Sequence, residues 1–142
     1  MRQIIKDQHP ALFIWAAARI PGDFNPETTR WIGLVDDEEI LAVVMYTNFS
    51  KFDCCMHLAT SRKDWANKEF MRAAFAYPFE ELGLPRVTLA AESKNEAALR
   101  LHKKLGARHE GTVRKFLGDC DLVINGLLKS ECKYLKGATW AN

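Results

Sequence analysis

Two histidines fall in segments where a regular backbone would hold a side chain in place. His57 lies in a predicted strand over residues 52–59, and His102 lies in a predicted helix that ends at Leu105. Imidazole titrates close to neutral pH, so each ring suits a general acid or a general base. Asp53, four residues before His57, would share its face of the strand. The alternatives are an ordinary polar strand residue for His57 and a solvent-exposed helical residue beside lysines for His102.

The four cysteines are potential nucleophiles or metal ligands, but their spacing favours neither role. Cys54 and Cys55 are adjacent and would point to opposite faces of a strand. With His57 they form a Cys-Cys-x-His group, but no second ligand pair at metal spacing accompanies it, so we expect no metal site. A thiol nucleophile would need a base to lower its pKa. We therefore interpret these two, with Cys120 and Cys132, as reduced, small apolar residues of a cytoplasmic protein.

The composition is that of one ordinary globular domain. The chain has 142 residues, with 20 Lys+Arg against 18 Asp+Glu, a net charge of +2 and 48% hydrophobic residues. This length is typical of a single domain over residues 1–142, and the apolar fraction excludes a disordered chain. The balanced charge favours neither a nucleic-acid nor a membrane partner. The apolar segment 11–18 is too short to span a bilayer. With Pro10 at its start, it predicts an amphipathic helix that ends near Arg19.

The apolar periodicity predicts a mixed sheet with helices packed on it. Strands are expected at residues 3–5, 31–35, 40–46, 52–59, 86–91, 108–116 and 121–128. The strongest helix covers residues 69–82. Its predicted core face consists of Met71, Phe75, Phe79 and Leu82. Pro78 lies inside this helix and lacks the N–H that would bond the carbonyl of Ala74, so we expect a kink there.

A series of short segments also matches a known pattern in order and spacing. The segments are Phe79-Glu80-Glu81-Leu82-Gly83-Leu84, Arg86-Val87, Asn95-Glu96-Ala97-Ala98, Leu105-Gly106-Ala107, Glu110-Gly111, Arg114, Asp121-Leu122-Val123-Ile124-Asn125-Gly126-Leu127-Leu128 and Glu131-Cys132. Over roughly residues 56–136 the chain resembles the GCN5-related N-acetyltransferase (GNAT) superfamily. Within that superfamily it is most similar to the ribosomal-protein N-terminal acetyltransferase type.

The resemblance implies an α/β (α+β) fold in which a mixed, mostly antiparallel sheet splays between its fourth and fifth strands, with helices on both faces. Acetyl-coenzyme A (acetyl-CoA) would lie in that opening. Its pantetheine arm would pair with the backbone of Leu58, Ala59 and Thr60. Its pyrophosphate would meet the start of a helix over residues 65–82, where unpaired N–H groups and the helix dipole favour an anion.

The predicted pyrophosphate loop departs from the family's pattern. It consists of Arg62, Lys63, Asp64, Trp65, Ala66 and Asn67. Lys63 and Trp65 stand where the family has small residues, usually glycines, which let backbone approach the phosphates. Trp65 would obstruct the pyrophosphate, and Asp64 adds a negative charge. Positive charge comes from Arg62, Lys63 and Lys68, so the resemblance implies an atypical acetyl-CoA site.

The same resemblance gives roles to three further residues. His102 takes the position of a helix tyrosine in the family and would protonate the departing thiolate. Asn95 would contact the cofactor arm or serve only as a helix cap. His57 would be the base for the amine, with Asp53 on the same strand face as the alternative. These roles predict an N-acetyltransferase that moves an acetyl group from acetyl-CoA to a primary amine, on a protein N-terminus or a small molecule, by direct attack.

The alternative is a catalytically degenerate module of the same fold with a binding or structural role, for example in a phage-associated setting. The substitutions at Lys63 and Trp65 favour it. In either case we expect a cytoplasmic monomer or homodimer. No acceptor motif is readable in residues 11–30 or 114–121, the segments that build the acceptor pocket in the family.

Overall fold

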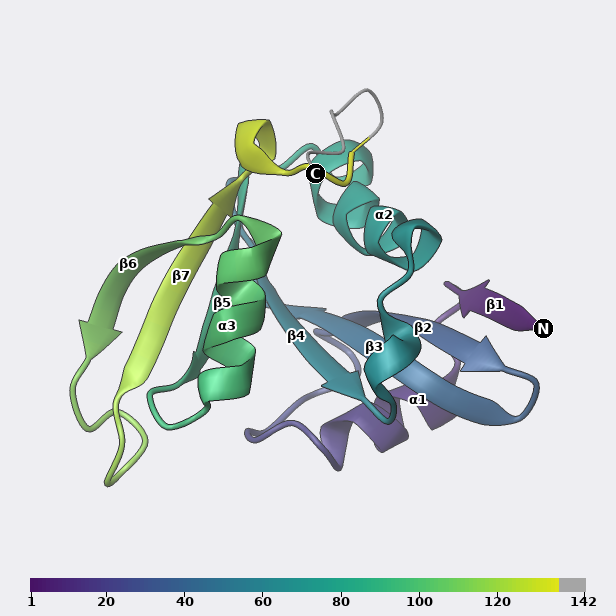
Figure 1. The fold of residues 1–142 in the computed structure, drawn as a ribbon, viewed down its shortest axis with the longest axis horizontal. Helices are drawn as coiled ribbons and strands as arrows, with labels where there is room; N and C mark the ends of the chain where they lie inside the picture. The colour runs from purple at the N-terminus through teal and green to yellow at the C-terminus, as the bar shows by residue number, and fades with distance from the viewer. Residues whose placement is uncertain (136–142) are drawn as a thin grey trace.

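A single seven-stranded sheet organises the protein (Figure 1). The computed structural model describes residues 1–135. In sheet order the strands are β1 (Arg2–Ile5), β2 (Arg30–Asp36), β3 (Glu39–Thr47), β4 (Cys55–Thr60), β5 (Arg86–Glu92), β7 (Leu122–Leu128) and β6 (Arg108–Val113). Neighbouring strands run antiparallel except β4 and β5, which run parallel. The predicted mixed, mostly antiparallel sheet is confirmed.

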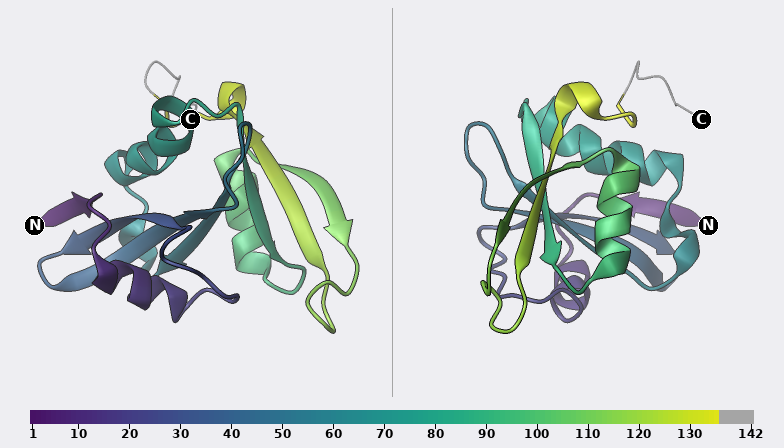
Figure 2. Two further views of the ribbon diagram at one scale, coloured as in Figure 1. Left: turned by 180° about the vertical axis from the view of Figure 1, so that it is seen from behind. Right: turned by 60° about the vertical axis from the view of Figure 1, so that its left-hand side comes forward.

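β4 and β5 share only a short stretch of pairing. Cys55 pairs with Thr88 and Met56 with Leu89, and within residues 1–135 no further pair joins the two strands. Past this point the strands diverge, and the sheet opens into the V seen in Figures 1 and 2. The predicted splay between the fourth and fifth strands is confirmed.

Helices cover both faces of the sheet, as predicted. α1 (Pro10–Ala17) packs against β2 and β3 on one face, whereas α2 (Lys68–Ala76) and α3 (Glu96–Leu105) lie on the other (Figure 2). Two apolar cores result. The larger lies between the sheet, α2 and α3, and the smaller lies under α1. Two short 3-10 turns, η1 (Lys63–Trp65) and η3 (Lys129–Glu131), precede α2 and follow β7.

The helix predicted from Pro10 is present as α1, but it is apolar around its whole circumference, so its predicted amphipathic character is wrong. Leu12 and Ala16 are buried, while Ile14 on the outer side is 67% exposed. The helix ends at Ala17 rather than near Arg19. Among the helices described, none has the length and apolar character that a membrane crossing needs.

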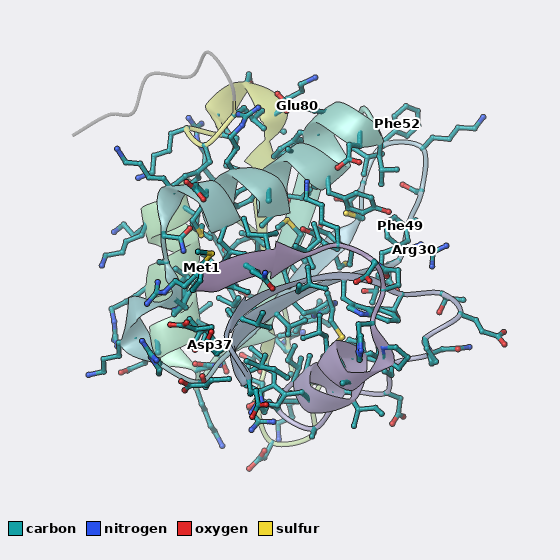
Figure 3. All side chains as sticks on the ribbon, turned by 90° about the vertical axis from the view of Figure 1, so that its right-hand side faces the viewer. Met1, Arg30, Asp37, Phe49, Phe52 and Glu80 are labelled. Atoms are coloured by element: carbon teal, nitrogen blue, oxygen red, sulfur yellow. The ribbon has the colours of Figure 1, made fainter. Side chains whose placement is uncertain are left out.

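The strand predicted over residues 52–59 begins later, at Cys55. Residues 50–53 close a tight turn instead: the Ser50 amide donates to the Asp53 carbonyl at 2.9 Å, and the Asp53 amide donates to the Ser50 hydroxyl at 3.1 Å. Phe52 therefore lies at the surface and is 67% exposed (Figure 3).

Pro78 interrupts the helix, as predicted, and a distant side chain compensates for it. After α2 the chain continues as a π-helical turn, η2 (Tyr77–Glu81). The carbonyl of Ala74, which Pro78 cannot satisfy, accepts a hydrogen bond from the hydroxyl of Tyr46 on β3 at 2.6 Å. The strand thus supplies the donor that the helix lacks.

The core face predicted for this helix is confirmed for Met71, Phe75 and Phe79, which are buried. It is wrong for Leu82, which is 43% exposed. The reason is that the wider π-turn shifts the residues after it out of α-helical phase.

Candidate active site

A narrow apolar cavity of about 50 Å³ lies where the sheet opens between β4 and β5. Its walls come from both arms of the V and from the helices beside it. They include Met56 and Leu58 of β4, Leu89 of β5, Phe75 of α2 and Leu105 of α3. Both histidines singled out by the sequence also line it, as does Trp65, and no described lining residue is an acid, a lysine or an arginine.

β4 has an open edge at this cavity. Leu58, Ala59 and Thr60, the residues predicted to pair with the pantetheine arm, pair on one side with residues 42–44 of β3. Their other edge faces the opening, because β5 pairs with β4 only as far as Met56. An unpaired strand edge offers backbone N–H and C=O groups to an extended ligand. The structure therefore brings the predicted backbone residues to the opening.

The predicted pyrophosphate loop contains a helical turn of its own. Lys63–Trp65 form η1, and α2 begins only at Lys68, so the helix start predicted at residue 65 is wrong. Asn67 caps α2, with its Oδ1 accepting from the Phe70 amide at 2.7 Å. This cap occupies one of the N–H groups that an anion would use at a helix start.

The charged residues of this loop that the structure describes, Arg62 and Lys63, do not line the cavity. Arg62 forms an ion pair with Glu39 at 3.0 Å. Lys63 and Ala66 are exposed, and the side chain of Asp64 lies outside the described residues. The predicted loop therefore lines the cavity, in its described part, through Trp65 alone.

The Trp65 indole is a half-buried wall of the cavity. It meets Phe70 edge to face, with ring centroids 6.2 Å apart and the planes at 89°. This contact ties the indole to the first turn of α2. An indole in this position can obstruct a ligand, as predicted, or contact one directly.

His102 is buried, with 9% of its surface exposed, so the solvent-exposed alternative is wrong. Its Nδ1 lies 3.1 Å from the side-chain nitrogen of Asn125 on β7. Burial lowers the pKa of His102, so the uncharged ring prevails at neutral pH. The imidazolium expected as proton donor is therefore not its resting form.

His57 borders the same cavity from β4, but its ring lies on the α1 side of the sheet. It pairs across the strands with Met45, which is buried in the core under α1. Its ring contacts Phe24 at 5.2 Å between centroids, and its Nε2 lies 2.8 Å from the Thr47 hydroxyl. Burial lowers the pKa of His57 to about 4, so the ring is unprotonated at neutral pH, as a base must be before it acts. The two histidines thus approach the opening from opposite faces.

Asn95 caps α3, its Oδ1 accepting from the Ala98 amide at 3.1 Å. Ser93, two residues earlier, does not cap this helix, since its hydroxyl accepts from the Asp121 amide at 3.1 Å. The cap is confirmed. Asn95 is not among the described residues that line the cavity, and its contact with a cofactor arm stays a prediction.

Asp53, considered above as a strand residue, belongs to an ion-pair cluster that the sequence did not reveal. Its carboxylate accepts from Nε of Arg86 at 3.2 Å and from the Thr88 hydroxyl at 2.9 Å. Arg86 also donates to both carboxylate oxygens of Glu110, at 2.8 and 3.0 Å. Glu110 reaches across β7 at Gly126, where a Cβ would overlap its carboxylate. The cluster joins the two arms of the V.

The four cysteines are free, and burial disfavours a thiolate at three of them. Burial raises the pKa of Cys54 to about 12 and that of Cys132 to about 11, and it also raises the pKa of Cys55. This agrees with small apolar residues rather than nucleophiles. In the part of the chain that is described, no three His, Cys, Asp or Glu side chains are grouped so that they could hold a metal ion.

The fold has close counterparts among solved structures. A chimeric form of the Vibrio cholerae spermidine N-acetyltransferase matches with a TM-score of 0.70 at 14% identity, over 94% of this chain and 98% of that chain. The Escherichia coli ribosomal-protein-S18-alanine N-acetyltransferase gives a TM-score of 0.63 at 18% identity, over 90% and 94%. A probable acetyltransferase is 27% identical with a TM-score of 0.59, over 73% of this chain and 63% of its own.

No protein-family model and no curated protein matches the sequence. The structural likeness shows the fold, which is that of the GNAT acetyltransferases. The resemblance inferred from the sequence is confirmed at this level, including the parallel β4–β5 pair at which the sheet opens.

Proposed function

We propose that this chain, which has the GNAT fold, binds acetyl-CoA between β4 and β5 and transfers the acetyl group to a primary amine. The observation that carries the proposal is the open edge of β4 at residues 58–60 beside an apolar cavity. An extended arm that contains amides would pair with that edge as a further strand does, and the cavity would take its apolar parts. Spermidine and a ribosomal-protein alanine, the groups in the names of two structural neighbours, are the acceptor types to test first.

Several residues of the chain would have separate roles in this acetyl transfer. When bound, acetyl-CoA supplies the acetyl thioester. His57, uncharged at neutral pH, would take a proton from the amine, directly or through water. A backbone N–H of β4 would polarise the acetyl carbonyl. His102, also uncharged, would stabilise the sulfur through a hydrogen bond. The start of α2, with Lys63 and Arg62 nearby, would attract the pyrophosphate.

The variant His102→Phe tests this division because it keeps a flat ring in the cavity and removes both ring nitrogens. We expect turnover to fall by about 10- to 100-fold, the loss of one hydrogen bond to developing charge. The Kd for acetyl-CoA should change little. His109→Phe is the matched control, since His109 is exposed on β6. Unchanged turnover in His102→Phe would remove this residue from the mechanism.

A second candidate function is favoured by the loop. Lys63 and Trp65 replace residues that would let backbone approach a phosphate closely, and the cavity of about 50 Å³ is narrow. These features suit a catalytically degenerate module with a binding or structural role, for example in a phage-associated assembly.

Calorimetric titration of the purified chain with acetyl-CoA, and separately with coenzyme A, tells the two functions apart. The enzyme requires saturable binding and acetylation of spermidine or of an alanine-terminated peptide. No binding at millimolar ligand contradicts the enzyme. Binding without turnover on an amine panel supports the module.

A further inference from the structure

Two buried polar side chains lie against each other beside the cavity. His102 and Asn125 are both buried, and they bond to one another at 3.1 Å. Asn125 is only 7% exposed. Burying an amide and an imidazole among apolar neighbours costs free energy unless hydrogen bonds compensate. Each side chain therefore depends on the other.

The sheet and the helix hold both partners in place. Asn125 lies in the middle of β7, paired with Leu89 of β5 on one side and with His109 of β6 on the other. Leu89 itself lines the cavity. His102 lies in the last turns of α3, a helix that ends on Gly106 in a left-handed conformation with φ of 100°. The bond between them joins β7, which is paired on both sides, to the helix α3.

The chemistry of the pair determines where the ring proton lies. The amide nitrogen of Asn125 only donates, so Nδ1 of His102 must accept. In an uncharged imidazole the proton then resides on Nε2. His57 is the only other titratable side chain among the described residues that line the cavity, and its ring lies on the opposite face of the sheet. No carboxylate in that lining favours the other tautomer.

We propose that Asn125 is a positioning residue, which fixes His102 in the Nε2–H tautomer and keeps a hydrogen-bond donor available to the cavity. Asn125 touches no substrate in this role and acts through His102. That the donor meets the sulfur or carbonyl of an acyl thioester rests on the proposed function. The tautomer does not, since it follows from the ligand-free protein.

Nitrogen-15 NMR of the imidazole rings tests the tautomer directly, with the His102 signals assigned by their loss in His102→Gln. The wild-type ring should carry its proton on Nε2. Asn125→Asp presents a carboxylate of nearly the same shape, which accepts from Nδ1–H, so the proton should move to Nδ1 and the ring's pKa should rise. Asn125→Leu keeps the volume without a polar atom and should give a mixture of tautomers. A wild-type ring protonated on Nδ1 overturns the proposal, whether or not a variant folds. Finding the same His102 tautomer in the wild type, Asn125→Asp and Asn125→Leu also overturns it.

The pH dependence of turnover gives a second readout. It distinguishes a failure of the positioning role of Asn125 from a failure of the proposed acetyltransferase function. In the wild type His102 keeps its Nε2 proton at every pH above its lowered pKa, so its contribution to kcat should be flat. In Asn125→Asp the Nε2 proton is lost as pH rises through the raised pKa, and kcat should fall by about tenfold across that range. A flat profile for both proteins, in an active enzyme, overturns the positioning role. A chain that binds no acetyl-CoA contradicts the proposed function and leaves the NMR result to decide the tautomer.

Discussion

Replacing Tyr46 with phenylalanine tests how the helix beside the cavity tolerates a proline. Tyr46 is fully buried, and its hydroxyl donates to the carbonyl of Ala74 at 2.6 Å. Pro78, four residues after Ala74, has no N–H for that carbonyl. Phenylalanine keeps the ring and its edge contact with Tyr77. In the wild type the centroids of these two rings are 4.9 Å apart. The variant therefore removes one hydroxyl and leaves one buried carbonyl without its donor.

The expected loss follows from the cost of an unsatisfied buried acceptor, about 1–3 kcal/mol. We expect the free energy of unfolding to fall by about 2 kcal/mol, measured by urea denaturation followed by circular dichroism. The melting temperature should fall by roughly 4–8 °C for a domain of this size. Tyr77→Phe is the matched control, because no hydrogen bond of its hydroxyl is described within residues 1–135. Its effect should stay within about 0.5 kcal/mol.

A double-mutant cycle gives the outcome that would refute the reasoning. Pro78→Ala restores an N–H four residues after Ala74, so the helix gains a donor of its own for this carbonyl. Tyr46→Phe should then cost about 1 kcal/mol less in the Pro78→Ala background than in the wild type. Equal losses in both backgrounds would show that the hydroxyl does not replace the missing N–H. A loss below about 0.5 kcal/mol in the wild type would show the same.

Three further predictions concern the site. Trp65→Gly should tighten acetyl-CoA binding by about three- to tenfold in calorimetry, because glycine allows close backbone approach; weaker binding would make the indole a ligand contact. Gly126→Ala should displace the Glu110 carboxylate from Arg86 and cost about 1 kcal/mol in urea unfolding. The double variant Gly126→Ala/Glu110→Gln should be no less stable than Gly126→Ala, because the ion pair is already lost. A further loss of unfolding free energy in the double variant would show that Glu110 still contacts Arg86 in Gly126→Ala. Burial lowers the pKa of His57 from 6.5 to about 4. Between those values the unfolded chain binds a proton that the native chain does not, so stability should rise with pH by up to about 1.4 kcal/mol per unit. In His57→Gln the free energy of unfolding should rise less steeply with pH. An unchanged pH dependence would show that another group causes the rise.

Features that depend on neighbouring residues were predictable from the sequence. The interruption at Pro78 follows from a missing N–H, and the cap at Asn95 follows from an amide side chain at a helix start. The mixed sheet and its splay between the fourth and fifth strands followed from the family resemblance, and the structure has both.

Features that depend on distant partners were not predictable. Tyr46 and Ala74 are 28 residues apart, and Asp53 and Arg86 are 33 apart. No local pattern specifies such pairs, because they depend on how strands and helices meet in space. The predicted strand therefore began too early. It included Asp53, which lies in a turn before β4 and accepts a hydrogen bond from Arg86.

His102 is an intermediate case. Its flanking lysines favoured an exposed residue, yet it shares a helix face with Ala98 and Leu105 at spacings of four and three. That spacing was a readable sign of burial. Its partner was not readable, because Asn125 lies 23 residues away on another element.

Stability alone does not account for the opening between β4 and β5. An open edge at residues 58–60 forgoes strand pairing, and an apolar cavity forgoes dispersion contacts. The buried pair of His102 and Asn125 adds two polar groups that need each other to avoid a desolvation penalty. Apolar side chains filling the same V would remove the cavity and the buried polar pair, and a longer β5 pairing would close the edge. The acyl transfer proposed above would use such an arrangement, because it places a fixed hydrogen-bond donor beside the cavity. Titrating acetyl-CoA into the wild type and Trp65→Gly decides whether the loop still admits the ligand.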